Sequence, residues 1–395
     1  MSLNFRFAIA TDLHIGLPHT IPEHPMRFHR IEISISNFQY VIDQLSQLDV
    51  DFLLIPGDLT QNGEFENHEW LSQALAQLPF PAYVIPGNHD ALEQQPTETS
   101  IGIDAFPQYY EKYGYGQNEV EQRQDNQQGP VGDLKQAERQ LYYTCCPLPG
   151  LRLIGLNSIA YEEDGKQHYN GYIDKRQLEW LKQVLAESKA KAGAREQVFV
   201  MVHHNVLEHL PNQATSKLGR RYMLENAAAL IEILQEAGVQ LVFTGHLHVQ
   251  DIAHHPQANL FDITTGSLVS YPHPYRICRY RQNDQGHAQL MIESNRITAA
   301  PGWPDLQAMS RDFVQEHSLR FIRRLLTDPP LNLSDEEVDP LLPHLRNFWT
   351  DIADGDAQFD FPQLPAPVQA FFQAFSAQHQ WDNHAILDLH HPSSP

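Results

Sequence analysis

Short apolar runs alternate with amphipathic segments along the first half of the chain. Apolar runs of strand length occupy residues 5–11, 51–56 and 82–86. Between them, apolar residues recur at helical spacing over residues 31–48 and again near 66–77. Strands that alternate with helices at this pitch indicate a layered α/β fold.

The alternation continues to about residue 300. Further strands are predicted over residues 142–146, 151–157, 197–202, 240–244, 260–268 and 289–294, and further helices over 174–188 and 222–237. Residues 115–140 are rich in Gln, Gly, Asn and Asp, which predicts a long loop or insertion.

The pattern of apolar and polar residues changes near residue 301, at a Pro-Gly-Trp-Pro sequence that interrupts regular secondary structure. Beyond it the apolar spacing is helical, and Pro-rich turns such as TDPPLN and FPQLPAP divide the helices. The pattern predicts two units, a catalytic domain over residues 1–300 and a helical C-terminal appendage over residues 301–395.

Composition narrows the classes of function. The 395 residues include 42% hydrophobic side chains, ample for a large core, and the formal net charge is -22. This acidity argues against binding nucleic acid through a broad basic face and against binding an anionic membrane. An acidic protein that handles anionic substrates needs local positive charge, and bound metal cations are one source of it.

Cysteine usage and the chain start favour a cytoplasmic location. The only cysteines are Cys145, Cys146 and Cys278, an odd number that is not typical of a disulfide framework. The first residues lack the pattern of a signal peptide, and no apolar stretch reaches the ~18 residues of a membrane span.

Polar side chains follow five of the predicted strands. The clusters are DLH at 12–14, GD at 57–58, GNHD at 87–90, HH at 203–204 and GHLH at 245–248. The carboxyl ends of strands in an open α/β sheet are where ligands bind, so clusters that are distant in sequence can meet on one rim.

The residue types in these clusters are those of a metal site without sulfur. Carboxylate, amide oxygen and imidazole suit Mn, Fe, Zn or Co. Taken singly, Asp12 and Asp58 are better explained as helix N-caps, whereas together with the imidazoles they are better explained as ligands. Five clusters that each follow a strand predict a site for two divalent or trivalent metal ions.

The order of the clusters resembles the signature of the calcineurin-like metallophosphoesterase family, which reads D-x-H, G-D, G-N-H-[DE], H and G-H-x-H. The resemblance covers roughly residues 5–295, although Asn205 stands where family members often carry Pro after the His pair. It implies a layered α/β/β/α sandwich of two mixed β-sheets flanked by helices.

The resemblance also implies a role for each matched position. One metal ion would be held by Asp12, His14 and His248, the other by Asn88, His203 and His246, and Asp58 would bridge both. A metal-bridging hydroxide would attack the phosphoester in line, without a covalent enzyme intermediate. His89 would assist the leaving oxygen as a catalytic residue, and Asp90 would orient His89.

The flanking segments favour one branch of the family. GDLTQNG, GYIDKRQLEWL and TTGSLVSYPHPYR resemble the cyclic-nucleotide and glycerophosphodiester phosphodiesterase branch. The helical C-terminal region resembles an appendage of some bacterial members. The expected partner is therefore a small phosphodiester substrate, with no membrane and no nucleic acid involved; a homo-oligomer is left open.

Further residues are candidates to line the substrate pocket; a structural role is an equal alternative for each of them except His204, for which a direct role is the lesser alternative. They are Arg27, His204, Tyr271, Tyr275 and Arg276. Arginine can pair with phosphate and tyrosine can stack on a base. The remaining conspicuous histidines are predicted to be surface or structural residues: His24, His29, His209, His254, His255 and His273.

Three other functions compete with this interpretation. DLHIG also occurs in a DNA-processing nuclease branch of the superfamily, and a phosphomonoesterase would use the same metal ligands. A scaffold that kept the fold without the chemistry would bind partners through the helical appendage. Such a scaffold predicts missing ligands, whereas every matched position is intact.

Overall fold

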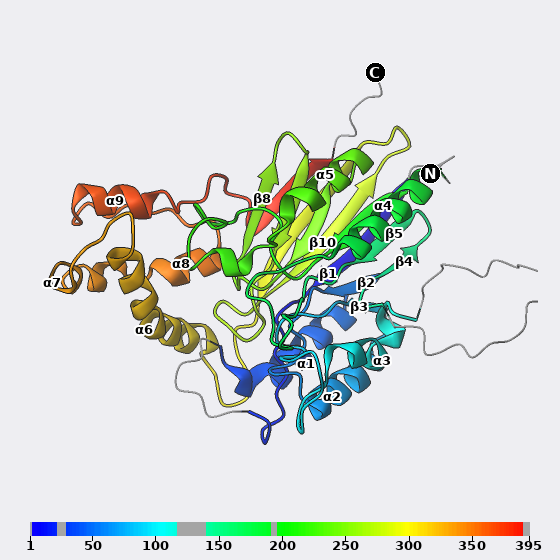
Figure 1. Cartoon of the computed structure of the whole chain (residues 1–395), viewed down its shortest axis with the longest axis horizontal. Coiled ribbons are helices and arrows are strands. Elements are labelled where there is room, and N and C mark those ends of the chain that lie inside the picture. The colour runs from blue at the N-terminus through cyan, green and yellow to red at the C-terminus, as the bar shows by residue number, and fades with distance from the viewer. Residues whose placement is uncertain (1, 22–28, 117–139, 191–195, 390–395) are drawn as a thin grey trace, which may run out of the picture.

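A computed structural model describes residues 2–21, 29–116, 140–190 and 196–389. Two six-stranded sheets face each other, and helices cover their outer faces (Figure 1). This is the α/β sandwich of two mixed sheets that the sequence predicts. The predicted loop over 115–140 lies largely outside the described residues.

The first sheet has the strand order β12-β11-β10-β1-β2-β3. Its strands are β1 (Leu3–Ile9), β2 (Phe52–Ile55), β3 (Ala82–Val84), β10 (Pro274–Gln282), β11 (Ala288–Arg296) and β12 (His384–Leu389). Strands β1, β2 and β3 run parallel, and the pairs that involve β10, β11 and β12 are antiparallel.

The second sheet has the order β4-β5-β6-β7-β9-β8. Its strands are β4 (Tyr143–Leu148), β5 (Leu151–Gly155), β6 (Gln197–Met201), β7 (Leu241–Thr244), β8 (Asp251–His255) and β9 (Leu260–Thr264). The four strands β5, β6, β7 and β9 are parallel, with antiparallel strands at both edges.

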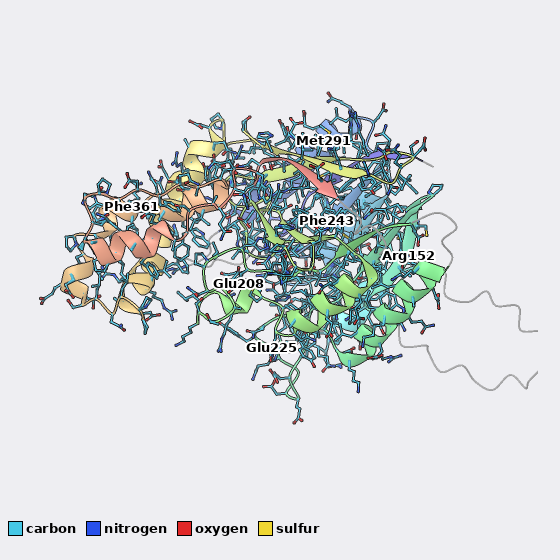
Figure 2. The ribbon with its side chains drawn as sticks, turned by 90° about the horizontal axis from the view of Figure 1, so that it is seen from above. Arg152, Glu208, Glu225, Phe243, Met291 and Phe361 are labelled. Atoms are coloured by element: carbon cyan, nitrogen blue, oxygen red, sulfur yellow. The ribbon has the colours of Figure 1, made fainter. Side chains whose placement is uncertain are left out.

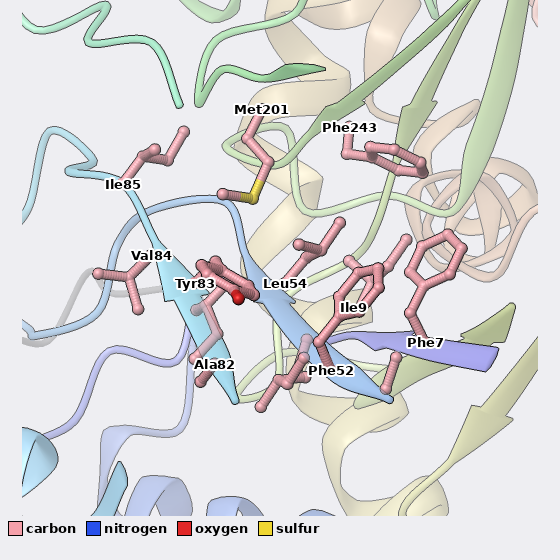
Figure 3. Close-up of a cluster of buried hydrophobic side chains, with 14 of the residues drawn as sticks. Phe7, Ile9, Phe52, Leu54, Ala82, Tyr83, Val84, Ile85, Met201 and Phe243 are labelled. Atoms are coloured by element: carbon pink, nitrogen blue, oxygen red, sulfur yellow. The ribbon is translucent and has the colours of Figure 1, made fainter. Parts of the chain in front are cut away.

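The main core lies between the two sheets. The ring centroid of Phe7 on β1 is 5.2 Å from that of Phe199 on β6 and 5.6 Å from that of Phe243 on β7. Figure 3 shows Phe243 and Met201 of the second sheet facing the strands of the first. This packing fixes how the two sets of strand ends lie relative to each other.

Helices on the outside of the sandwich bury one apolar face each. They are α1 (Ser34–Ser46), α2 (Phe65–Leu75), α3 (Phe106–Tyr109), α4 (Lys175–Ala190) and α5 (Ala227–Ala237). Short 3-10 helices are η1 (Ile31–Ile33), η2 (Ile103–Ala105), η3 (Glu111–Tyr113), η4 (Arg220–Tyr222) and η5 (Leu342–Leu345). On α1, Phe38, Val41 and Leu45 are buried, the i, i+3, i+7 spacing of one helix face.

The C-terminal helices gather at one end of the sandwich, where Figure 2 labels Phe361. They are α6 (Leu306–Thr327), α7 (Asp335–Val338), α8 (Phe348–Asp354) and α9 (Ala366–Gln373). Their core is built around Phe348, whose ring centroid lies 4.7 Å from that of Phe372. Leu247 and Val249, from the loop after β7, belong to the same core.

Three strands were not predicted from the sequence: β8, β10 and β12. Strand β12 changes the picture most, because it follows the C-terminal helices and pairs with β11 of the first sheet. Residues 301–395 are therefore helical only as far as α9. Within the described ranges, no helix combines the length and apolarity needed to cross a bilayer.

Candidate metal centre

The five predicted clusters meet at the carboxyl ends of the central strands. Asp12 and His14 follow β1, Asp58 follows β2, and Asn88 follows β3 of the first sheet. From the second sheet, His203 follows β6, and the pair His246 and His248 follows β7. The face-to-face packing of the sheets brings these loops together.

Asp12, His14, Asp58 and His248 form the first group of potential ligands, with all four ligand atoms within 4.8 Å of one another. His248 Nε2 lies 3.2 Å from Asp12 Oδ1 and 3.3 Å from His14 Nε2. His14 Nε2 lies 3.7 Å from Asp58 Oδ2. Two oxygens and two ring nitrogens thus converge on one point.

Asp58, His203 and His246 form the second group, again within 4.8 Å of one another. His203 Nε2 lies 3.4 Å from Asp58 Oδ1 and 3.1 Å from Asn88 Oδ1. His246 Nε2 donates to the backbone oxygen of Arg221 at 3.2 Å, which leaves Nδ1 with its lone pair. Asp58 therefore belongs to both groups and directs one oxygen toward each.

Outer contacts hold these side chains in place. His203 Nδ1 donates to the Pro56 carbonyl oxygen at 2.8 Å, which points Nε2 inward. Asp12 Oδ2 accepts from Thr11 Oγ1 at 2.8 Å, and Asp58 Oδ1 accepts from the His89 backbone N–H at 2.8 Å. A second hydrogen bond that fixes the orientation of each ligand is typical of metal sites.

The backbone at this rim is unusual. Five residues of the two groups have positive φ, between 43° and 67°: Asp12, His14, Asp58, His246 and His248. Non-glycine residues adopt this left-handed conformation rarely, and such strain gathers at functional sites. Two glycines allow the loops to approach, since a Cβ on Gly87 would lie 2.2 Å from Asp58 Oδ1 and one on Gly245 would lie 2.5 Å from Asp12 Oδ2.

Asp58 and His203 shift each other's pKa in opposite directions. Burial raises the pKa of Asp58, but the imidazoles of His203 and His89 outweigh it and hold the pKa well below its usual range. Burial lowers the pKa of His203, but the Asp58 carboxylate reverses this and raises the pKa to about 9. A cation that takes this site must displace the His203 proton, as metal binding to imidazole ordinarily does.

The imidazoles of His14 and His246 are held neutral, as metal ligands must be. Burial, together with neighbouring imidazoles, lowers the pKa of His14 and of His246 well below the usual value. The donor set consists of carboxylate and amide oxygens and ring nitrogens, without sulfur in the described groups. Such a set fits Mn, Fe, Zn or Co.

Comparison with known families agrees with this geometry. The family model for calcineurin-like phosphoesterases matches residues 5–250, more than half of the chain. The chain belongs to this family. The match ends just beyond the GHLH cluster, so it includes all five clusters and excludes the C-terminal helices.

Relatives of this calcineurin-like phosphoesterase are distant. It is 22% identical over 213 residues to a probable cyclic nucleotide phosphodiesterase of Vesicomyosocius okutanii, covering 54% of this chain and 68% of that one. It is 26% identical over 202 residues to a probable glycerophosphodiester phosphodiesterase of Arcobacter nitrofigilis, covering 50% and 56%. Among solved structures, a dimetal phosphatase from Danio rerio is similar in fold, with a TM-score of 0.53, 15% identity, and 74% and 96% of the two chains covered.

His89 lies beside the metal groups and lines a cavity of about 510 Å³ next to them. Its Nδ1 donates to the Gln61 carbonyl oxygen at 2.6 Å, and its ring stands edge-on to that of His14, with centroids 4.7 Å apart. Because Nδ1 is engaged, Nε2 is the ring nitrogen left to meet a substrate.

The expected role of Asp90 is wrong in one respect. Its carboxylate accepts hydrogen bonds from the backbone N–H groups of Leu59, Thr60 and Gly87 and from the Thr60 hydroxyl. The group that orients the His89 ring is the Gln61 carbonyl instead. Asp90 thus ties together the loops after β2 and β3; burial and the Asp58 charge raise its pKa to about 7.

The structure describes four of the five residues predicted to line the substrate pocket, and it places them in different environments. Tyr271 lines the cavity, whereas His204 packs behind His246, with ring centroids 4.4 Å apart, and bonds to Ser158. Arg276 and Tyr275 are buried in β10 away from it, which corrects that expectation. Arg276 donates to two backbone carbonyls and the Thr265 hydroxyl. Arg27 lies outside the described residues.

Several lining residues were missed. His29 was expected to be a surface or structural residue, yet its ring stacks on that of His14 at 4.4 Å and forms a third potential ligand group with His14 and His248. The others are Arg221, Tyr222, Phe321 and Trp349. No local pattern marks them, because the last two come from the C-terminal helices.

Proposed function

We propose that this protein is a metal-dependent phosphodiesterase that uses two cations. The observation that carries the proposal is the pair of ligand groups that share Asp58, each with one of its carboxylate oxygens. Asp12, His14 and His248 would hold one cation, and Asn88, His203 and His246 the other. Bound cations supply acidified water at neutral pH and stabilise charge on the phosphoryl oxygens.

The chain's own side chains supply the remaining functions. His89 Nε2 lies at the edge of the cavity, where it can donate a proton or hydrogen bond to the leaving alcohol oxygen. Arg221 lines the same cavity and can pair with a phosphate oxygen. Small diesters, either cyclic nucleotides or glycerophosphodiesters, are the favoured substrates, which the names of the distant relatives support.

Hydrolysis of bis(p-nitrophenyl) phosphate with added Mn²⁺ tests this function. We expect release of nitrophenolate, and we expect Asp58→Ala or Asn88→Ala to abolish it together with metal binding. Asp388→Ala, an exposed change on β12, is the matched control and should behave as the wild type. Purified, metal-loaded protein that hydrolyses neither diesters nor monoesters would refute the proposal.

A further inference from the structure

The C-terminal helices form one wall of the cavity beside the metal groups. Val314 and Phe321 of α6 and Trp349 and Ala353 of α8 line it opposite His89 and the metal ligands. The rings of Phe321 and Trp349 meet edge-on, with centroids 4.8 Å apart. The wall that faces the polar metal residues is therefore apolar and aromatic.

A second cavity of about 710 Å³ adjoins the first. Tyr222, Phe321 and Trp349 line both cavities, so these three rings form a wall that the two share. The second cavity lies between α6, α9 and the loop before η4, and we call it the apolar cavity. Its volume lies within the range of about 300–1,000 Å³ of small-molecule sites.

Half-buried apolar side chains make up one part of the lining of the apolar cavity, and polar side chains such as Asn212, Thr215 and Ser216 make up another. Leu218, Leu325, Phe371 and Phe375 each keep part of their surface accessible there. Single exposed apolar residues are normal, but several gathered in one hollow mark a binding site. Of the charged lining residues, Lys217 and Arg324 are exposed and Asp328 is half-buried.

Tyr222 connects the apolar cavity to the metal centre. Its ring centroid lies 5.1 Å from that of His246, and the neighbouring Arg221 holds His246 Nε2 through its backbone oxygen. The Arg221 guanidinium lies 5.2 Å from the Tyr222 ring centroid. On one side of a phosphate bound at the metal groups, the Arg221 guanidinium would come first, followed by the Tyr222 ring and then by the apolar cavity.

We propose that the apolar cavity binds a long alkyl or acyl chain on one alcohol of the phosphodiester substrate. The inference rests on the proposed function, and within phosphodiester hydrolysis it selects open-chain diesters with one apolar substituent over cyclic nucleotides and unsubstituted glycerophosphodiesters. The adjacency of the two cavities supports this occupant, because a chain attached to a phosphate at the metal groups would reach the apolar cavity past the shared ring of Tyr222. A short polar diester would leave the apolar cavity without a use.

A series of alkyl p-nitrophenyl phosphates tests the proposal on the full-length, Mn²⁺-loaded protein. Methyl, butyl and octyl esters share the same leaving group, so differences in kcat/KM report the binding of the alkyl chain. We expect kcat/KM to rise at least about tenfold from methyl to octyl, since each buried methylene favours binding. The octyl ester is used below the concentration at which it forms micelles.

Two substitutions on one helix turn locate the effect. Ala374, directly after α9, lines the apolar cavity, whereas Ala370, one turn earlier, is not among its lining residues; both side chains are exposed. Ala374→Trp should fill the cavity and bring the octyl-to-methyl ratio of kcat/KM close to one. Ala370→Trp should keep the wild-type ratio, and the ratio cancels any general loss of activity.

The outcomes separate the two proposals. A wild-type ratio near one, or a high ratio that survives Ala374→Trp, would overturn the assignment of the apolar cavity while leaving phosphodiester hydrolysis intact. Failure to hydrolyse the methyl ester and bis(p-nitrophenyl) phosphate alike would instead overturn the proposed function.

Discussion

Five residues of the candidate metal centre have left-handed backbone conformations. Each such conformation costs roughly 1–3 kcal/mol in a non-glycine residue and persists only where the surroundings determine it. Here the surroundings are the sandwich core on one side and backbone hydrogen bonds on the other, such as that from the His14 N–H to the Asp58 carbonyl oxygen at 3.0 Å. The loops are therefore shaped to direct donor atoms inward at the expense of local stability.

His89 provides a test that separates catalysis from metal binding. Its side chain bonds to the Gln61 carbonyl, while its contact with Asp58 uses the backbone N–H, which any residue retains. We expect His89→Ala to lower kcat about 10²–10⁴-fold, the usual contribution of a general acid. Metal content, measured by elemental analysis, should stay at the wild-type level.

His203→Ala is the comparison for that experiment. It removes a potential ligand that lies 3.4 Å from Asp58, so metal content and kcat should fall together. If His89→Ala lost metal in the same proportion as activity, His89 would have to be a ligand.

The predicted residues that the structure brings together are those whose placement follows from local position in the sequence. Asp12, Asp58 and Asn88 each stand directly after an apolar strand, and such ends converge in a parallel sheet. Arg276 was misjudged because burial of a charged side chain depends on distant carbonyls, among them that of Asp382. Likewise, nothing near His29 in the sequence indicates that it stacks on His14.

At the scale of elements, the loop after β6 is fastened to β8 and β9. Asp262 on β9 accepts hydrogen bonds from the backbone N–H groups of Val206 and Leu207. The buried ring of His209 contacts Asp251 through Nδ1 at 2.6 Å and Asp262 through Nε2 at 3.3 Å. These contacts position the loop that begins with His203.

This cluster predicts a pH dependence of stability. Burial lowers the pKa of His209, but Asp262 and Asp251 outweigh it and raise the pKa to about 10. Because the unfolded value is near 6.5, the stabilisation is fully present below about pH 6.5 and is lost as the pH rises toward 10. At the low end of this pH range His209→Gln should destabilise the protein by roughly 1–3 kcal/mol, because it removes the cation that lies beside the buried carboxylate of Asp262.

Urea unfolding of the wild type and His209→Gln at several pH values between about 6.5 and 9.5 measures this effect. The difference in the free energy of unfolding should shrink as the pH rises. A difference that stays constant over this range would show that the His209 charge contributes nothing. Leu207, which meets Asp262 only through its backbone, is a control position, because Leu207→Met should show the wild-type pH dependence.

Strand β12 shows where prediction of elements from sequence fails. Ala385, Leu387 and Leu389 are buried, and the residues between them are exposed, so the strand does alternate. The exposed side includes Ile386, which is 61% exposed and hides the alternation in the sequence. Strand β11 ends at Arg296, and its partner β12 begins at His384, 88 positions later. The pairing of the two strands is therefore not visible in the local sequence.

The whole molecule couples its C-terminal helices to the metal centre. Leu247 stands between His246 and His248, and its side chain is buried in the core of the C-terminal helices. The return of β12 to the first sheet fastens the other end of this region. The C-terminal region is therefore part of the structure that holds the GHLH loop in place. The helical periodicity of the sequence after residue 301 does not reveal this contact.

This coupling predicts that a core substitution among the C-terminal helices affects metal binding only where it touches the GHLH loop. Leu247→Ala should cost about 2–5 kcal/mol of stability, because it leaves a cavity in that core. It should also weaken Mn²⁺ binding, since His246 and His248 lose the packing that holds their loop.

Leu345→Ala, a fully buried change in the same core, should cost a similar amount of stability and leave Mn²⁺ affinity unchanged. Denaturant unfolding and titration calorimetry measure the two quantities; equal Mn²⁺ affinities for both variants would show that the helices and the metal loop are energetically independent.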